Sequence, residues 1–413
     1  MKKPLILALT TLLAACNPQK PDAPEPGGGN NNVEPKTPGL EMFYKGGTMC
    51  FASYLQDFGL RYLDGGIVTD PYASMEAHGA NCVRLQLDRE SFPSYGGVTI
   101  DWQGFARVSS DAAKAVSEGL QLVLTLKPDR DQFSASSTDH NIIPSDWTSL
   151  SEKELASALY DWVYSSLEKL ATQKIYPAIV AVGNEVNIGF LRPGASAAAD
   201  NARTGRLLAS GLKAVRDYAA KYNPACLSAL HIANPALAID AATTIIRSGG
   251  GDFDILALSY YPGKDIGHSL PQGGFAAIAK AFEGKALMVL ETAYTFTDGK
   301  AGGKWMGDWC DNAYNFPDWD ESKNKTNYTP AACRKWYADL ARELKSIGGA
   351  GLVTWGTESL PDQQEGAVEG HGKGIYTYPA AWAYGSTWEN NSYWDFTDNN
   401  NIHEGIDWMK DIN

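Results

Sequence analysis

The chain has 413 residues, 44% hydrophobic and 20% charged, which is typical of a globular protein and long enough for one large domain or two ordinary ones. Its formal net charge is −13, from 35 basic and 48 acidic residues. Because phosphate binding needs a basic face, this charge argues against nucleic acid as a partner and is compatible with a neutral substrate.

The first residues, MKKPLILALTTLLAAC, have the pattern of an export signal. Lys2 and Lys3 precede an apolar run over residues 5–13 that is too short to span a membrane as a mature helix. The stretch ends in Leu-Ala-Ala-Cys, which resembles a bacterial lipobox. We therefore expect residues 1–15 to be a lipoprotein signal peptide and Cys16 to be lipidated; a plain secretion signal followed by a chance cysteine is the alternative.

Residues 16–39 are rich in Pro, Gly and Asn and have no apolar periodicity, which predicts a flexible tether. The tether would hold a folded body, residues 40–413, away from the lipid. No other segment has the length and hydrophobicity of a membrane span, so contact with a membrane would be through the lipid alone. These features predict an outer membrane lipoprotein at the cell surface, or otherwise facing the periplasm.

The folded body contains eight short apolar runs that alternate with helical patterns. Most of the runs are continuously apolar, as expected for strands that are buried on both faces. They cover residues 43–48, 81–87, 120–126, 178–185, 226–232, 254–261, 286–292 and 350–356.

Helices are predicted between several of these runs, at 70–79, 199–224, 330–349 and, most clearly, 151–173. The last of these opens with Ser151 followed by Glu154 three residues later, the pattern of a capping box. Eight strand–helix units predict a (β/α)₈ TIM barrel with extended βα loops after the third, seventh and eighth strands. A two-domain α/β protein is the alternative, although no linker divides the body.

Two glutamates end strands of this predicted barrel. Glu185 ends the fourth strand and Glu291 the seventh, so both would lie at the barrel mouth where TIM barrels carry their sites. Two carboxyl groups facing one cleft are the minimal equipment for glycoside hydrolysis: one gives a proton to the leaving oxygen, and the other attacks the anomeric carbon or activates water.

Five further residues converge on the same mouth as candidate substrate-binding residues. Arg84, in the second strand, would pair with Glu291, and Tyr261, at the end of the sixth, would bond the same carboxylate. Asn184 would bond a sugar 2-hydroxyl, a contact that strengthens in an oxocarbenium-like transition state. His231 and Trp355 end the fifth and eighth strands, and the tryptophan would form the floor of a sugar subsite.

Several motifs together resemble the endo-β-1,4-galactanases of glycoside hydrolase family 53, in clan A. The matching segments are VGNEVNIGFL, FDILALSYYP, VLETAYTF, GLVTWG and STWENNSYWDF, with KGGTMCFASYLQDFG and HGANCVRLQL nearer the start. The similarity covers residues 44–397.

The resemblance implies a TIM barrel and a retaining double displacement on galactan or type I arabinogalactan. It assigns Glu185 as acid/base and Glu291 as nucleophile, gives Asn184 and Arg84 their clan positions, and makes Asn187 the start of a binding loop. Another clan A β-glycanase, such as a mannanase or glucanase, and a non-catalytic surface glycan-binding lipoprotein are the alternatives. The chemistry needs no cofactor; the expected partner is the polysaccharide, and the expected state is a monomer.

Two loops depart from the family pattern. In a region where the family usually has an aromatic–histidine run, this chain instead has Lys127, Asp129 and Arg130. The long seventh loop, residues 298–330, corresponds to a region that holds calcium in some family members. Its oxygen ligands would come from four aspartates, Asp308, Asp311, Asp318 and Asp320, but their spacing matches no known calcium loop, and a solvated acidic loop is the alternative.

The cysteines and tryptophans give two more expectations. Cys82 and Cys226 lie in apolar runs and should be buried thiols, Cys310 and Cys333 flank a polar loop in which they would pair, and no spacing matches a zinc site. Six of the 12 tryptophans belong to the seventh and eighth loops, where we expect stacking on galactose rings: Trp305, Trp309, Trp319, Trp382, Trp388 and Trp394.

Overall fold

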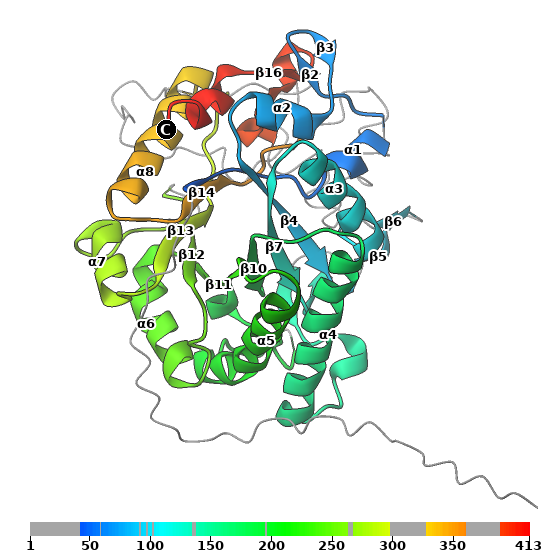
Figure 1. The fold of residues 1–413 in the computed structure, drawn as a ribbon, viewed down its shortest axis with the longest axis vertical. Coiled ribbons are helices and arrows are strands. Elements are labelled where there is room, and N and C mark those ends of the chain that lie inside the picture. The colour runs from blue at the N-terminus through cyan, green and yellow to red at the C-terminus, as the bar shows by residue number, and fades with distance from the viewer. Residues whose placement is uncertain are drawn as a thin grey trace, which may run out of the picture. The chain divides into compact units, whose positions relative to one another are not determined.

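Eight parallel strands close into a barrel at the centre of the protein (Figure 1). The computed structural model describes residues 42–57, 59–90, 92–95, 98–100, 103–133, 138–194, 196–262, 267–297, 328–360 and 389–413. In ring order the strands are β1 (Tyr44–Thr48), β14 (Gly351–Thr354), β13 (Ala286–Glu291), β12 (Ile255–Ser259), β11 (Leu227–Ala233), β10 (Ile179–Val182), β7 (Gln121–Lys127) and β4 (Cys82–Asp88). Each predicted strand is present, and the closed ring excludes the two-domain alternative.

Helices surround the barrel strands, as Figure 1 shows. They are α1 (Ala52–Asp57), α2 (Pro71–Ala77), α3 (Phe105–Ser117), α4 (Glu152–Thr172), α5 (Asn201–Tyr222), α6 (Pro235–Arg247), α7 (Gly274–Ala281) and α8 (Pro330–Ser346). The capping box predicted for α4 is confirmed, because the Ser151 and Glu154 side chains each accept the other residue's backbone N–H. No helix in the described ranges combines the length and hydrophobicity needed to span a membrane.

The structure also contains small sheets that are separate from the closed barrel. A four-stranded sheet joins β15 (Trp394–Asp395), β16 (Asn401–Ile402), β2 (Leu63–Asp64) and β3 (Ile67–Val68) in that order. Two hairpins, β5 (Phe92–Tyr95) with β6 (Val98–Ile100) and β8 (Arg130–Phe133) with β9 (Thr138–Ile142), lie in the loops that follow β4 and β7. Short 3₁₀ turns occur at Ser145–Trp147, Val186–Ile188, Glu389–Asn391, Phe396–Asp398 and Glu404–Met409.

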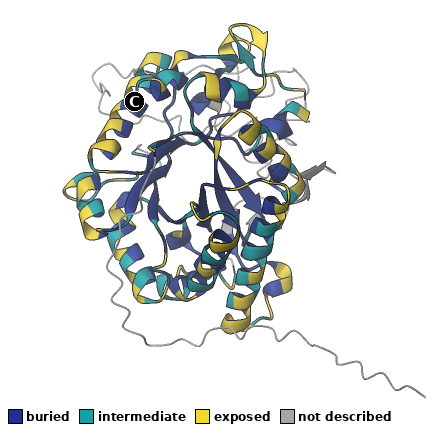
Figure 2. Cartoon of the chain, in the orientation of Figure 1, coloured by how far each residue is buried: buried dark blue, intermediate teal, exposed yellow. Residues whose placement is uncertain are grey.

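The strands bury both faces, as their continuous apolar runs predict (Figure 2). One set of residues, including Val123, Ile179 and Met288, packs inside the barrel. The alternate set, including Leu124 and Val180, packs against the helices. By the same alternation, polar residues near the carboxyl ends of strands point into the barrel, and this brings side chains from different strands to a common mouth.

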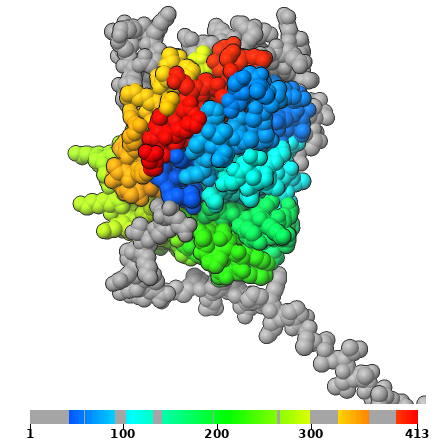
Figure 3. Space-filling view, turned by 45° about the horizontal axis from the view of Figure 1, so that its top comes forward, coloured from blue at the N-terminus to red at the C-terminus, as the bar shows by residue number. Residues whose placement is uncertain are grey.

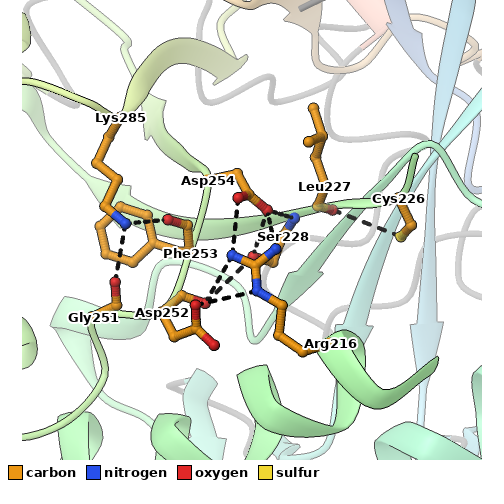
Figure 4. Close-up of polar contacts among 9 residues, drawn as sticks. All are labelled: Arg216, Cys226, Leu227, Ser228, Gly251, Asp252, Phe253, Asp254 and Lys285. Atoms are coloured by element: carbon orange, nitrogen blue, oxygen red, sulfur yellow. Dashed lines mark hydrogen bonds and ion pairs between the residues drawn. The ribbon is translucent and has the colours of Figure 1, made fainter. Parts of the chain in front are cut away.

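The opposite, amino-terminal ends of β11 and β12 are fastened by a charged network (Figure 4). Arg216 of α5 donates to both carboxylate oxygens of Asp254, at 2.6 and 2.9 Å, and to Asp252 at 3.2 Å. Asp254 also accepts the Ser228 backbone N–H at 2.8 Å. Lys285 caps the carbonyl groups of Gly251 and Phe253. This cluster joins a helix to two strands far from the mouth, so its role is structural.

The C-terminal segment packs against early and late parts of the barrel domain. Figure 3 shows it, in red, beside α8 and the blue N-terminal part of the described chain. Lys45 donates to the Met409 and Ile412 carbonyls at 2.6 Å each, and Arg334 of α8 makes two 2.7 Å bonds to Asp411. These contacts fix both ends of the described domain to the same side of the barrel.

Candidate active site

Glu185 is held in a strained turn immediately after β10. Its φ and ψ are 46° and 50°, the left-handed region that costs a non-glycine residue on the order of 1–2 kcal/mol. Gly183, at φ 84°, makes this turn possible, because a Cβ there would lie 2.7 Å from the Phe190 ring. Strain of this kind persists only where surrounding contacts hold it, and it is concentrated at functional sites.

Glu291 reaches the mouth by means of a β-bulge. Val289 pairs with Leu258, but the next residue of β12, Ser259, pairs with Glu291 and not with Leu290. An extra residue in one strand re-aims the side chains that follow it. The Glu291 carboxylate therefore meets Tyr261, whose hydroxyl donates to Oε2 at 3.0 Å, and this is the contact expected from the sequence.

Arg84 organises the centre of the site. Its fully buried guanidinium donates to Glu291 Oε1 at 2.5 Å, to Asn184 Oδ1 at 2.7 Å and to Thr125 Oγ1 at 3.0 Å. The same group lies 5.5 Å from the centre of the Trp355 ring. One guanidinium, from the second barrel strand, thus contacts a carboxylate, an amide and an aromatic ring contributed by the ends of strands seven, four and eight.

The two carboxyl groups have different surroundings. Desolvation by the surrounding protein and, next, the negative charge of Glu291 raise the pKa of Glu185 to about 7, with the bond from Ser259 and the Arg84 charge acting in the opposite direction. Glu291, by contrast, is in direct contact with Arg84 and Tyr261. A proton-holding carboxyl beside an ion-paired one is the arrangement that glycoside hydrolysis requires.

The structure corrects two of the expected substrate contacts. His231 is fully buried, with Nδ1 accepting the Glu185 backbone N–H at 3.4 Å and Nε2 at 2.9 Å from Ser259 Oγ, so it cannot touch a sugar. Asn187 is 7% exposed, and both ends of its amide bond the Ala233 backbone, at 2.7 and 3.0 Å. Both residues instead clamp the Glu185 turn to β11.

Sequence reasoning missed two members of the site. Ser259 lies at the end of β12, and Thr125 lies in β7 as the third partner of Arg84. The signal for Ser259 was present, because it lies two residues before Tyr261, and residues two apart in a strand share a face.

The chain is similar to known proteins over most of its length. It matches the family described as glycosyl hydrolase family 53 over residues 44–408. The chain belongs to this family. It is therefore a glycoside hydrolase, and its barrel is the family's catalytic domain.

Curated relatives and solved structures agree with this membership. An arabinogalactan endo-beta-1,4-galactanase of Cellvibrio japonicus is 28% identical over 97% of this chain and 95% of its own length. An endo-beta-1,4-galactanase of Bacillus subtilis is 27% identical over 62% of this chain and 57% of its own. The Ignisphaera aggregans GH53 catalytic domain has the same fold, with a TM-score of 0.69 and 24% identity over 91% of this chain and 98% of that chain.

In the region where the family usually has an aromatic–histidine run, this chain carries a buried lysine. Lys127 and Asp129, at the end of β7, are 5% and 1% exposed, and Lys127 is the register partner of Asp88 on β4. Arg130 instead points to the Ile143 carbonyl at 3.2 Å and lies 4.0 Å from Glu90. Charged side chains therefore lie at the carboxyl ends of β4, the strand that carries Arg84, and of its neighbour β7.

The expectations for the long loops lie mostly outside the described residues. These include the four candidate calcium ligands, Cys310, and five of the six loop tryptophans, namely Trp305, Trp309, Trp319, Trp382 and Trp388. Trp394 is fully buried and packs edge-on against Tyr62, so the prediction that it stacks on sugar is wrong.

Cys82 and Cys226 are buried free thiols as predicted, and Cys333 is also buried and free. Within the described ranges, no three His, Cys, Asp or Glu side chains form a metal-binding group.

Proposed function

We propose that the protein is a retaining endo-β-1,4-galactanase that cleaves internal bonds of galactan and type I arabinogalactan. The observation that carries the chemistry is the pair Glu185 and Glu291, held in contrasting surroundings at one barrel mouth. The substrate class is supported by membership of family 53 and by the Cellvibrio japonicus relative, which aligns over nearly the whole of both chains.

In the first step, Glu291 is the nucleophile. Arg84 and Tyr261 hold one carboxylate oxygen each and aim the group at the anomeric carbon. The pKa of Glu185, raised to about 7, keeps a large fraction of this carboxyl group protonated near neutral pH. The protonated group gives its proton to the glycosidic oxygen as the bond to the anomeric carbon breaks. The products of this step are a galactosyl ester on Glu291 and a carboxylate at Glu185.

In the second step, Glu185 becomes the base. Esterification removes the negative charge of Glu291, which is one of the two causes that raise the pKa of Glu185. The carboxylate takes a proton from water, and the oxygen of that water attacks the anomeric carbon and frees Glu291. Two inversions give net retention of the β configuration.

Asn184 and Trp355 complete the contacts with the reacting sugar. The oxygen of the Asn184 amide is bonded to Arg84, so its NH₂ group is the part that would donate to the 2-hydroxyl. The half-buried Trp355 ring, positioned beside Arg84, would support the sugar face.

A time course of oligosaccharides released from linear β-1,4-galactan tests the proposal. We expect early release of several chain lengths, as internal cleavage requires, and a β-anomer as the first product in NMR spectra of the fresh reaction. Release from mannan or glucan at a higher kcat/KM would favour another clan A glycanase. Binding to galactan without release of reducing ends would indicate a glycan-binding protein.

We further propose that the enzyme is anchored by lipid at the outer membrane. The support is the sequence alone: the Leu-Ala-Ala-Cys run before Cys16 and the Pro/Gly/Asn-rich segment after it. Each buried CH₂ contributes about 0.8 kcal/mol, so several acyl chains give stable attachment where one does not. The Cys16→Ala variant should therefore move galactanase activity from the membrane fraction to the soluble one, and persistence in the membrane fraction would contradict the anchor.

A further inference from the structure

Two large apolar side chains are exposed on neighbouring loops at the barrel mouth. Ile188 is 46% exposed in the loop that follows β10, and Leu237 is 51% exposed at the start of α6, which follows β11. Exposed apolar residues that occur singly need no explanation, but apolar residues gathered beside a site indicate a binding surface. Because both loops leave the carboxyl ends of paired strands, the two side chains belong to the same part of the rim as Glu185.

The two loops are joined by a fixed contact. The side-chain amide of Asn187, directly before Ile188, donates to the Ala233 carbonyl at 3.0 Å and accepts the Ala233 N–H at 2.7 Å. Ala233 is the last residue of β11 and precedes the N-cap of α6. These bonds hold the start of α6 beside the Glu185 turn, so the two apolar side chains are presented on a fixed surface.

Local structure explains why these two side chains face outward at the mouth. The Ile188 N–H donates to the Glu185 carbonyl at 3.1 Å and closes a 3₁₀ turn in which Val186 and Asn187 are buried. Leu237 is the third residue of α6, and the Cα–Cβ bonds of a helix tilt toward its N-terminus, which lies at the mouth. Neither turn requires an apolar residue at these positions, because polar residues are at least as suitable in the first turn of a helix or in an exposed loop.

We propose that Ile188 and Leu237 form the surface that binds the galactosyl units on the leaving-group side of the cleaved bond. This inference rests on the proposed acid/base role of Glu185. The glycosidic oxygen departs with the leaving sugar, so this sugar must lie next to the group that protonates it. Arg84 and Trp355, from strands two and eight, lie with the nucleophile and serve the other sugar.

The chemistry of galactose fits an apolar surface. Its axial 4-hydroxyl leaves adjacent C–H groups together on the opposite face of the ring. Covering this face with isoleucine and leucine removes apolar area from water. Because such contact is not directional, the surface can accept successive units of a long chain, as internal cleavage requires.

The same surface gives the enzyme a second reaction after the first step. A sugar bound there can take the place of water: its hydroxyl oxygen forms a bond to the anomeric carbon, the ester bond to Glu291 breaks, and the hydroxyl proton goes to Glu185. The product is a lengthened β-galactoside. Transfer to an added acceptor therefore reports on occupancy of this surface.

The variants Ile188→Ser and Leu237→Ser test the inference with two substrates. For galactan, kcat/KM should fall by about fivefold in each variant, because an aliphatic side chain no longer covers the leaving sugar. For a dinitrophenyl β-galactobioside, which has no sugar on the leaving-group side, kcat/KM should change by less than about twofold. The concentration of added β-1,4-galactobiose that gives half-maximal transfer should rise by about fivefold.

Matched variants separate binding from general damage. Ile188→Val and Leu237→Met keep most of the apolar area and should retain kcat/KM on galactan within about twofold. Val116→Ser changes another exposed side chain, 42% exposed near the end of α3, which leads to the amino-terminal end of β7, and should alter neither kcat/KM nor transfer. Equal losses on the two substrates, an unchanged acceptor concentration, or the same loss in Val116→Ser would overturn the inference.

Failure of this inference is distinguishable from failure of the proposed function. If wild-type protein cleaves galactan and Glu185→Ala strongly lowers this cleavage, while both serine variants keep the wild-type kcat/KM, the acid/base assignment stands and the inference alone is wrong. If wild-type protein releases nothing from galactan, or if Glu185→Ala retains wild-type turnover, the proposed function itself is wrong, and the surface has no leaving sugar to bind.

Discussion

Arg84 and Glu291 form a 2.5 Å ion pair although 207 residues separate them in the chain. The arginine side chain is fully buried and that of the glutamate is 7% exposed. Removing one member of such a pair leaves an uncompensated charge, a loss that is typically larger than the net stabilisation by the pair itself. The pair is therefore both a part of the site and a weak point of the fold.

The Arg84→Lys variant should lose activity while keeping its charge. A lysine has no planar fork and cannot bond Glu291, Asn184 and Thr125 at the same time. We expect kcat/KM on galactan to fall by roughly 10²–10³, the range seen when a group that orients or stabilises the reacting centre is lost. Steady-state kinetics measures the loss of kcat/KM, and circular dichroism checks that the variant is folded. The matched control Arg216→Lys, in the network of Figure 4, should leave kcat/KM near the wild-type value.

The two carboxylates should be separable by rescue chemistry. Glu291→Ala should form no covalent intermediate with any substrate, because the attacking oxygen is gone. Glu185→Ala should lower kcat on galactan by roughly 10²–10⁴ but should still be galactosylated by a dinitrophenyl β-galactoside. Added azide should then restart turnover and yield a β-galactosyl azide. An α-azide, or rescue of Glu291→Ala to a β-product, would reverse the assignment of roles.

Catalysis should weaken as the pH rises through about 7. Glu185 must hold a proton to act as the acid, and its pKa is raised to about 7 by desolvation and by the Glu291 charge. The alkaline limb of the kcat/KM profile should therefore lie near this value in the free enzyme. A limb well above pH 8 would mean that another group supplies the proton.

The raised pKa of Glu185 should also make the stability of the fold depend on pH. The folded-state pKa of Glu185 is higher than its unfolded value, so its stabilising contribution is complete below the unfolded pKa and is lost as pH rises through about 7. Glu185→Gln removes the titration. Thermal unfolding should therefore show the variant gaining stability relative to the wild type between pH 5 and pH 8, and a constant difference across these conditions would contradict the shift.

The network at the amino-terminal strand ends should influence stability without influencing catalysis. Burial opposes the charged form of Asp254, but the bonds from Arg216 and Ser228 outweigh it and lower the pKa of Asp254. A lowered folded-state pKa stabilises above the unfolded pKa, and the contribution is lost as pH falls through the folded one. Asp254→Asn should cost about 2 kcal/mol of unfolding free energy at pH 7 and less at acid pH, with kcat/KM unchanged. A lowered kcat/KM in a fully folded sample would contradict a purely structural role.

The barrel could be predicted because its strands have a recognisable sequence pattern. Segments buried on both faces are continuously apolar, and eight of them separated by helical patterns leave few other folds. Four of the described helices, α1, α3, α6 and α7, were not predicted, and neither was the four-stranded sheet. Its strands have two residues each, so they are too short to show a period-two pattern.

The site was predictable only in part, for reasons of local geometry. Glu185 and Glu291 stand at strand ends, where their position follows from the strand boundaries. His231 stands at such an end too, but its side chain points inward beneath the mouth, and no sequence pattern distinguishes that depth from exposure. The bulge that re-aims Glu291 is a shift of one residue in register, which depends on the neighbouring strand and not on the segment itself.

The seam of the barrel, where β1 pairs with β14 from Tyr44↔Gly351 onward, has a consequence for biosynthesis. A growing chain passes through lengths that include Glu185 and Ser259 but lack Glu291 and β14. Such a chain has no functioning site, and its β1 edge offers unpaired backbone groups to other chains. Aggregation during synthesis is therefore the hazard specific to this topology, and it ends only when the last strand docks beside the first.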